Sequence, residues 1–218
     1  QALASALVHR EVRVRGQEKT FANLDVHAAS DSRHALCKFV YGRMFDWLVE
    51  RINISMVKST GGKAVNTNGG QHYIGILDIF GFEIFKHNSF EQLCINFTNE
   101  MLQQHFNNNT FKLEEEIYVK EGIQWDAIDF IDNQPMIDLI TGKRIGILPL
   151  LDEELKLPGG SDSKYLSRLL DKQMKNVAMK KTKSRNAFRV QHFAGIVEYD
   201  VLGFLEKNRD TLTEDLVD

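Results

Sequence analysis

The feature that most constrains this chain is a short apolar run that ends in an acidic, glycine-containing loop. The run, residues 73–79, is followed by the loop at 80–83 and then by a long amphipathic segment. An apolar run of this length, bounded by turn residues, predicts a buried strand. Asp78 stands near its end, and Gly81 in the loop lets a backbone N–H approach a ligand closely because glycine has no Cβ. Glu83 adds a second carboxylate.

This combination of groups suits a magnesium-bound phosphate. Magnesium prefers oxygen ligands, and catalysis of phosphoryl transfer consists mostly of positioning the groups and stabilising their charge. A loop with two acids and one glycine is also a common turn after a strand, and most such turns bind nothing. From the spacing of these residues alone, the plain turn remains the more frequent interpretation.

Composition limits the classes of protein to which the chain can belong. With 218 residues, 43% of them hydrophobic, it can form one large globular domain or two small ones. The formal net charge of -3 argues against a protein that binds polyanions over its whole surface. No apolar stretch reaches the roughly 20 residues that a membrane helix needs, and the first residues lack a signal-peptide pattern. A cytoplasmic protein without membrane contact is predicted.

The residues before the apolar run predict one strand and one long helix. The charged alternation of residues 11–15 indicates an edge strand. Residues 32–57 repeat apolar side chains at steps of three and four residues, which predicts a helix with one apolar face. Asp31 or Ser32 would cap its N-terminus. The stretch at residues 59–71 is rich in glycine and asparagine and predicts a surface loop.

A second long helix is predicted after the loop, over residues 89–120. It opens with Ser89 and Gln92 at the spacing of a capping box, in which each residue satisfies a free backbone N–H of the other. Residues 107–110, three asparagines and a threonine, cost this helix about 2 kcal/mol relative to alanines. This composition predicts a weak point rather than a break, and Gly122 is expected to end the helix.

A long, ordered sequence match lies at the start of this helix. Residues 88–100 read Asn-Ser-Phe-Glu-Gln-Leu-Cys-Ile-Asn-Phe-Thr-Asn-Glu, and Leu-Gln-Gln-His-Phe follows at 102–106. This sequence resembles the relay helix of the myosin motor domain, and residues 78–83 then match the second nucleotide switch of that family. The resemblance implies an α/β fold, mixed and helix-rich, as part of a P-loop NTPase-type motor with a central twisted sheet flanked by long helices.

The resemblance divides the chain into five parts. Residues 1–57 would be the end of the upper central subdomain and a long helix, and residues 58–87 a surface loop, the switch strand and the switch. Residues 88–132 would be the relay helix and relay loop. Residues 133–185 would form a helix-loop-helix actin-binding region and a basic loop, and residues 186–218 a strand hairpin and the start of the following helix.

The resemblance also implies roles for the residues of the switch. Asp78 would act on Mg²⁺ through a coordinated water, and the Gly81 amide would bind the γ-phosphate of ATP. Glu83 would pair with an arginine of the first switch and help to hold the attacking water. The nucleotide would therefore lie against Asp78, Ile79, Phe80 and Gly81.

In the same family the relay helix bends or straightens with the nucleotide state. The residues expected to serve this movement are Asn96, Phe97, Asn107, Asn108, Asn109 and Trp125. The three consecutive asparagines would make a bend easier, and Trp125 would contact the converter subdomain. From the sequence alone, the polar patch at 107–110 is more simply interpreted as a solvated surface turn.

A helix-loop-helix is predicted over residues 146–175, followed by a basic run at 172–189 that contains seven positive residues and no acid. A hairpin is predicted at 188–201. The tip of the helix-loop-helix, with Leu155 and Leu157 expected to be exposed, is either a packed corner or an interaction patch. Myosins use such a tip to bind actin, which implies an actin-binding set: Leu155, Lys156, Leu157, Pro158, Gly159, Lys180, Lys181 and Lys183.

Three functions compete on these observations. The first is an actin-based motor driven by ATP hydrolysis, located on the actin cytoskeleton. The chain shows neither a phosphate-binding loop nor a first switch, so we expect it to be a piece of a longer motor and inactive alone. Its partners would be actin, the rest of the motor with its P-loop, first switch and converter, and calmodulin-like light chains bound outside this chain.

The second possibility is a non-catalytic actin-binding or scaffold module derived from the same fold. The third, nucleic-acid binding through the basic run, is disfavoured because aromatic residues for base stacking are not interleaved there. Met101, Ile117, Leu157 and Gly159 depart from the residues common in the family, which weakens the inference of actin affinity. Phe80 stands at a variable position and favours an unconventional class.

Overall fold

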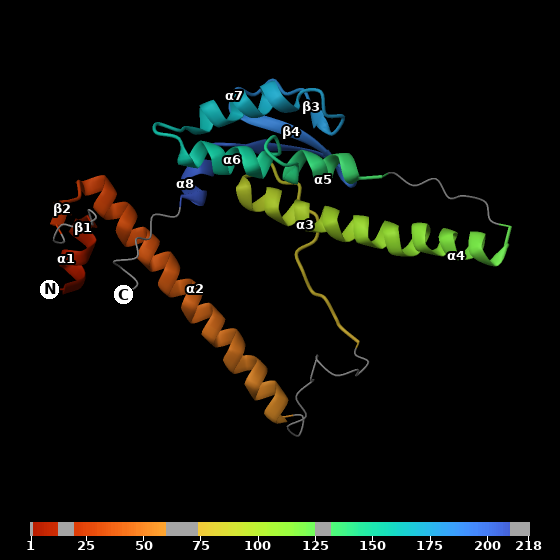
Figure 1. Ribbon diagram of the computed structural model, residues 1–218, viewed down its shortest axis with the longest axis horizontal. Coiled ribbons are helices and arrows are strands. Elements are labelled where there is room, and N and C mark those ends of the chain that lie inside the picture. Colours follow the sequence, from red (N-terminus) through yellow and green to blue (C-terminus); the bar gives the residue numbers. More distant parts are fainter. Residues whose placement is uncertain (1, 13–19, 60–73, 125–131, 210–218) are drawn as a thin grey trace. The chain divides into compact units, whose positions relative to one another are not determined.

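The computed structural model describes residues 2–12, 20–59, 74–124 and 132–209 (Figure 1). The chain divides into two compact units, Gln1–Ile76 with Asp210–Asp218 and Leu77–Arg209. Helices predominate over two small sheets. This composition confirms the predicted α/β class, mixed and helix-rich.

The first unit contains a short strand pair and one long helix. Helix α1 (Ala2–Val8) leads into β1 (His9–Val12), which pairs antiparallel with β2 (Thr20–Asn23). The edge strand predicted at residues 11–15 is confirmed in part, because β1 includes its first two residues. The rest of that prediction lies outside the described residues.

Helix α2 (Val26–Ser59) begins earlier than the sequence predicted. The Asp25 carboxylate accepts a hydrogen bond from the backbone N–H of Ala28 at 2.8 Å. Asp25 therefore satisfies a free N–H at the helix start, and the predicted cap at Asp31 or Ser32 is wrong, since both lie inside the helix. The alanines that follow Asp25 are the strongest helix formers and extend the helix in this direction.

The apolar face of α2 is largely exposed within its own unit. Val40, Phe45 and Leu48 each have about half of their side chain exposed. An amphipathic helix gains stability when such a face is covered. The loop predicted at residues 59–71 lies outside the described residues, except for residue 59, which ends α2.

The strand predicted at residues 73–79 is absent from the described part of this segment. Residues 74–80 form neither helix nor strand, and Ile74 and Ile76 are 98% and 96% exposed. A strand depends on hydrogen bonds to neighbouring strands. Among the described residues both sheets are formed by other segments, so this prediction is wrong for lack of a partner strand. The expected central twisted sheet is likewise not formed by the described residues.

The second unit packs helices against a small antiparallel sheet. Strands β3 (Met179–Lys180), β4 (Ala187–His192) and β5 (Gly195–Asp200) lie in the order β3-β4-β5. The β4–β5 pair confirms the hairpin predicted at 188–201. The helices of the unit are α3 (Phe90–Asn107), α4 (Leu113–Glu121), α5 (Gln134–Thr141), α6 (Ile147–Lys156), α7 (Asp162–Gln173) and α8 (Phe204–Asn208).

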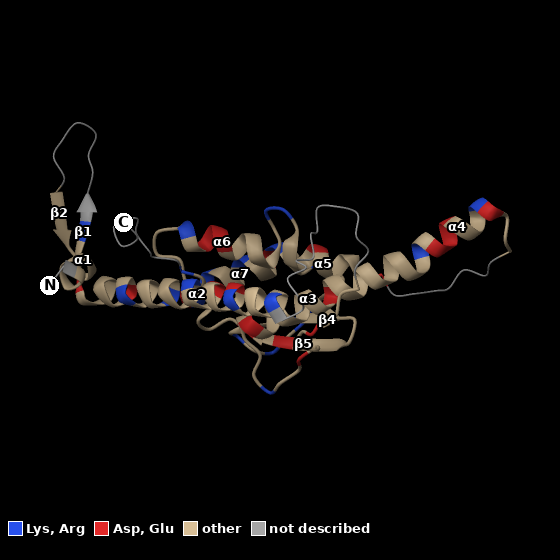
Figure 2. Cartoon of the chain, turned by 90° about the horizontal axis from the view of Figure 1, so that it is seen from below, with Lys and Arg blue, Asp and Glu red and all other residues tan. Residues whose placement is uncertain are grey.

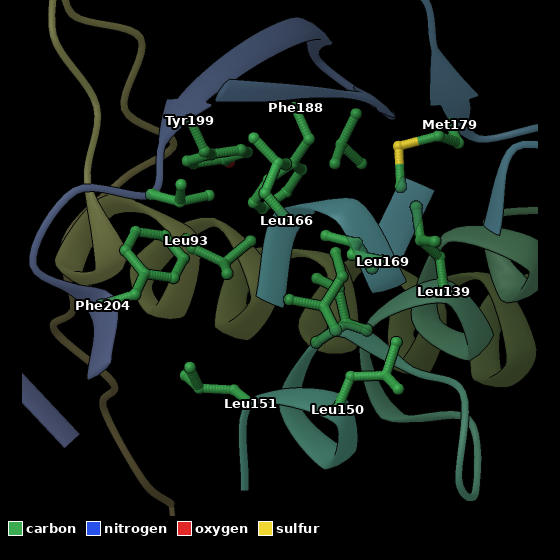
Figure 3. Close-up of a cluster of buried hydrophobic side chains, with 14 of the residues drawn as sticks. Leu93, Leu139, Leu150, Leu151, Leu166, Leu169, Met179, Phe188, Tyr199 and Phe204 are labelled. Atoms are coloured by element: carbon green, nitrogen blue, oxygen red, sulfur yellow. The ribbon is translucent and has the colours of Figure 1, made fainter. Parts of the chain in front are cut away.

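One hydrophobic cluster joins α3, α5, α6, α7 and α8 to the sheet (Figure 3). Leu93 of α3, Leu169 of α7 and Phe188 of β4 are fully buried in it. Helix α5 and strand β3 belong to the same unit and were not predicted, because each is too short to show a clear hydrophobic period. The core thus fixes the position of α3, on which the candidate site is built.

Helix α3 begins and weakens where the sequence predicted. The backbone N–H of Ser89 donates to Gln92 Oε1 at 3.0 Å, as the capping box requires. A π-helical turn, η1 (Asn108–Lys112), links α3 to α4 and overlaps the predicted weak point at 107–110. Gly122 ends α4 with a φ of 69°, a left-handed conformation that glycine adopts without strain. The predicted helix over 89–120 is therefore confirmed.

Helices α6 and α7 confirm the predicted helix-loop-helix. Gly160 fits the turn between them because a Cβ there would lie 2.3 Å from the backbone oxygen of Glu154. Leu157 is 45% exposed, as predicted. Leu155 is half-buried and packs against the core, so its predicted exposure is wrong. It follows Leu151 by one helical turn and shares the buried face of α6.

Candidate functional site

The loop at residues 78–83 is open to solvent beside helix α3. A cavity of about 490 Å³ is lined by residues of both segments: Asp78, Ile79, Phe80, Ile95 and Thr98. Among the described residues, none forms a hydrogen bond with the Asp78 carboxylate. A Cβ placed on Gly81 would meet no atom within 4 Å. The structure therefore brings the predicted nucleotide-contacting residues to one accessible place.

Three amide side chains of α3 hold this loop. Asn96 donates through Nδ2 to the backbone oxygen of Glu83 and accepts through Oδ1 from the N–H of Glu83, each at 2.8 Å. Asn99 Nδ2 donates to the backbone oxygen of Phe80 at 3.0 Å. Gln92 Nε2 donates to the Glu83 carboxylate at 3.4 Å. Steps of four and three residues place these amides on one side of the helix.

Phe82 anchors the loop on its other side. Its ring lies edge-on to the ring of His192, with centroids 5.1 Å apart, and to that of Phe193 at 5.4 Å. Such edge-to-face pairs are favourable because the positive ring edge meets a negative face. The loop is thus fixed between α3 and the turn of the β4–β5 hairpin.

A buried chain of hydrogen bonds continues from the loop into the hairpin. Asn96 Nδ2 donates to the hydroxyl of Tyr199 at 2.8 Å, and this hydroxyl is 2.8 Å from His192 Nε2. His192 Nδ1 lies 3.1 Å from Glu100 Oε1, and both side chains are fully buried. Burial raises the pKa of Tyr199 far above its usual range, so its hydroxyl keeps its proton.

Glu100 is the carboxylate at the end of this chain. Its Oε1 also accepts the backbone N–H of Phe193 at 2.8 Å, and its Oε2 accepts from Asn133 Nδ2. Asn133 immediately precedes α5, so the series of hydrogen bonds extends from the loop to the start of that helix. Glu100, His192 and Tyr199 were not predicted from the sequence. The one usable signal is a pair of polar residues, Asn96 and Glu100, on the helix face that carries Leu93.

The three consecutive asparagines lie in helical structure, so their interpretation as a surface turn is wrong. Asn107 is buried and its Oδ1 accepts from Gln103 Nε2 at 2.9 Å. Asn108 opens the π-helical turn, and Asn109 Nδ2 lies 2.7 Å from His105 Nε2. Bonds to residues one turn earlier satisfy the side chains locally, which allows poor helix formers to remain helical.

Two aromatic residues complete the predicted relay set. Phe97 is half-buried and packs against the hydrophobic cluster. Trp125 lies outside the described residues, so its contact with a converter stays a prediction.

The predicted actin-facing tip is the turn between α6 and α7. Residues 156–159 are exposed there. Gly159 has a φ of 72°, and its backbone oxygen accepts from Lys164 Nζ at 2.8 Å. Leu155 does not join this exposed set, because it packs inward. The tip therefore presents a short, structured surface with one exposed leucine.

The basic run at residues 172–189 is only in part a solvated loop. Lys180 lies in β3, is half-buried, and donates through Nζ to the backbone oxygen of Val177 at 3.0 Å. Lys181 and Lys183 are exposed between β3 and β4 (Figure 2 colours lysine and arginine blue). The interpretation as one loop is wrong because the run includes the end of α7, all of β3 and the start of β4.

The acidic residues of the loop allow a magnesium contact only of a limited kind. In the described ranges, no three His, Cys, Asp or Glu side chains form a metal-binding cluster. Magnesium in nucleotide sites keeps several waters and takes one or two carboxylates besides the phosphate oxygens. The exposed carboxylate of Asp78 lines the open cavity, so it could contact a magnesium ion there through a water molecule.

The whole chain matches one family of known proteins. The family model described as "Myosin head (motor domain)" matches residues 1–218. The chain belongs to the myosin head family. The identification of the loop at 78–83 as the second switch, and of α3 as the relay helix, stays a prediction from the sequence.

Similar proteins come from distant organisms. Myosin-2 of Arabidopsis thaliana is 49% identical over 196 residues, which cover 89% of this chain and 15% of that protein. Myosin-I heavy chain of Dictyostelium discoideum is 47% identical over 215 residues, or 98% of this chain and 9% of that protein. Unconventional myosin-Vb of Homo sapiens is 47% identical over 213 residues, which cover 97% of this chain and 11% of that protein. The chain thus spans only a small part of each myosin.

The described helices do not have the character of membrane spans. Throughout the part of the chain that the structure describes, none is both long enough and apolar enough to cross a bilayer.

Proposed function

We propose that this chain forms the switch, relay and actin-contact part of an actin-based motor driven by ATP hydrolysis. The observation that supports it most is the attachment of the loop to the relay helix. Asn96 and Asn99 hold the backbone at Glu83 and Phe80 through three hydrogen bonds of 2.8 to 3.0 Å. A displacement of this loop must either move α3 or break those bonds, so the loop and the helix move together.

The chemistry proposed for the loop uses three of its groups. Bound ATP with Mg²⁺ supplies the γ-phosphoryl group that is transferred to water. Asp78 would hold Mg²⁺ through a water molecule, and the Gly81 N–H would donate to the γ-phosphate. Glu83 pairs with an arginine of the first switch and orients the attacking water, while Gln92 holds its carboxylate from the relay helix. Fixed donors and charges of this kind stabilise the charge of the transferring group.

The actin-contact part of the proposal rests on two exposed surfaces. The tip at residues 156–159 offers Leu157 as an apolar contact. Lys181 and Lys183 add positive charge that attracts an acidic filament. Lys180 contributes less, because its ammonium is already engaged. The motor would act on the actin cytoskeleton in the cytoplasm, together with the remaining motor segments and with light chains bound elsewhere.

Replacing Gly81 tests the proposed chemistry. In a complete motor domain that contains this chain, we expect Gly81→Ala to bind ATP normally but to keep its backbone N–H from approaching the γ-phosphate, because the added Cβ stands in the way. Hydrolysis should fall by about 100- to 1000-fold, the usual cost of losing one such hydrogen bond. The added Cβ meets no described atom within 4 Å, so folding should be unaffected. The measurements are ATP binding and the phosphate burst in single turnovers.

A normal burst in the Gly81→Ala motor would contradict the assignment of Gly81. A complete protein that binds actin and never hydrolyses ATP would instead favour the non-catalytic scaffold.

A further inference from the structure

The side chain of Asn96 holds both the backbone N–H and the backbone oxygen of Glu83. Its Oδ1 accepts the Glu83 N–H and its Nδ2 donates to the Glu83 oxygen, so only one orientation of the amide satisfies both. A rotated amide would place its oxygen against the Glu83 oxygen and its NH₂ against the N–H. The orientation of Asn96 therefore determines how firmly Glu83 is held.

The hydroxyl of Tyr199 fixes this orientation. It accepts the second hydrogen of Asn96 Nδ2, so its own hydrogen points to His192 Nε2. His192 then donates from Nδ1 to Glu100 Oε1. Each member donates in the same direction, from the loop toward the buried carboxylate. Asn96, Glu100 and His192 are at most 2% exposed, so water does not compete for these bonds.

We propose that Tyr199 is a positioning residue for Glu83, acting through Asn96. This inference rests on the proposed function, in which Glu83 must be oriented for hydrolysis. Loss of the hydroxyl leaves one N–H of Asn96 and the Nε2 of His192 without a partner in a dry interior. Asn96 then samples other orientations, and the Glu83 peptide is held less firmly.

The chain offers a matched control. Tyr165 is also buried in the core, and its hydroxyl donates to the backbone oxygen of Ile147 at 3.1 Å, away from the loop. Tyr199→Phe and Tyr165→Phe each remove one buried hydroxyl and one donated hydrogen bond. A purely structural role predicts similar effects of the two changes on the loop. A positioning role predicts an effect of Tyr199→Phe alone.

The experiment uses complete motor domains carrying each substitution. Amide hydrogen exchange of residues 80–85 is measured first, without nucleotide. We expect about a tenfold faster exchange in Tyr199→Phe, as for the loss of one buried hydrogen bond, and wild-type exchange in Tyr165→Phe. The phosphate burst should slow in Tyr199→Phe while ATP binding stays normal. Asn96→Asp, which places an oxygen against the Glu83 oxygen, should loosen the loop at least as much.

Equal exchange of residues 80–85 in wild type and Tyr199→Phe would overturn the inference, and so would equal acceleration in both tyrosine variants. The exchange measurement needs no ATP hydrolysis, so it stands apart from the proposed function. If Gly81→Ala keeps a normal burst while Tyr199→Phe loosens the loop, the proposed chemistry fails and the positioning role remains. If Gly81→Ala blocks the burst while the loop is unchanged in Tyr199→Phe, only the positioning role fails.

Discussion

Glu100→Gln tests whether the buried carboxylate stabilises the second unit. Glu100 is fully buried and its two oxygens accept three hydrogen bonds, from His192, Phe193 and Asn133. Glutamine has nearly the same shape but only one acceptor oxygen. The substitution therefore changes the charge and the hydrogen bonding while it leaves the packing almost intact.

The cost follows from the positions of the three donors. If the glutamine oxygen takes the place of Oε1, it keeps the hydrogen bonds from Phe193 and His192. The glutamine NH₂ then faces the NH₂ of Asn133, and two donors meet. Asn133 cannot rotate without loss, because its Nδ2 also donates to the backbone oxygen of Glu100 at 2.9 Å. One buried group is left unpaired at about 1 to 3 kcal/mol, and the remaining bonds lose the assistance of the charge. The expected loss of stability is about 3 kcal/mol.

Amide hydrogen exchange in strands β4 and β5 measures this loss in the complete motor domain. A decrease of about 3 kcal/mol corresponds to roughly 150-fold faster exchange of the amides that open with this unit. Glu154→Gln is the control, because Glu154 is also buried but pairs with the partly exposed Arg168, which keeps Glu153 as a second partner. We expect a much smaller effect there. Equal effects of the two substitutions would refute the argument.

Three further predictions concern other parts of the chain. Alanines at 107–109 should stiffen the relay helix and reduce the coupling of hydrolysis to lever movement, and unchanged coupling in transient kinetics would dismiss this. Lys207 lowers the pKa of Glu91 below 4.5 by hydrogen bonding, so Lys207→Met should reduce stability above pH 4.5. The difference in stability between wild type and Lys207→Met should disappear as pH falls through the lowered pKa of Glu91. A difference in thermal unfolding that does not change with pH would contradict this pairing. Alanine at Lys181 and Lys183 should weaken actin cosedimentation severalfold at low salt but hardly at high salt, whereas an equal loss at both would exclude electrostatic attraction.

The parts of the fold that were predicted correctly depend on neighbours in the sequence. The capping box of α3 involves Ser89 and Gln92, three residues apart. The π-helical turn occurs where poor helix formers are consecutive, and Gly122 ends α4 within the same segment. Local propensity and capping determine such features, so the sequence contains the information directly.

The buried polar chain was missed because its members are distant in the sequence. Asn96 and Tyr199 are separated by 103 positions, and Glu100 and His192 by 92. Only the packing of the hairpin onto α3 brings them together. The predicted strand at 73–79 failed for a related reason, since a strand requires a neighbour that local sequence does not specify. Asp78, Gly81 and Glu83 could be proposed from the sequence, because one short loop contains all three, and their roles stay a prediction.

The arrangement of α3 explains how a small movement of the loop can have a distant effect. The amides of Gln92, Asn96 and Asn99 hold the loop, while Leu93, a neighbour of Asn96 on the helix surface, is fixed in the core. The helix has 18 residues and is about 27 Å long before the π-helical turn begins. A rigid rod of this length that pivots on its buried face converts a shift at the loop into a rotation. We expect that rotation to become a bend at the π-helical turn at its far end, since π-helical turns interrupt the regular hydrogen bonding.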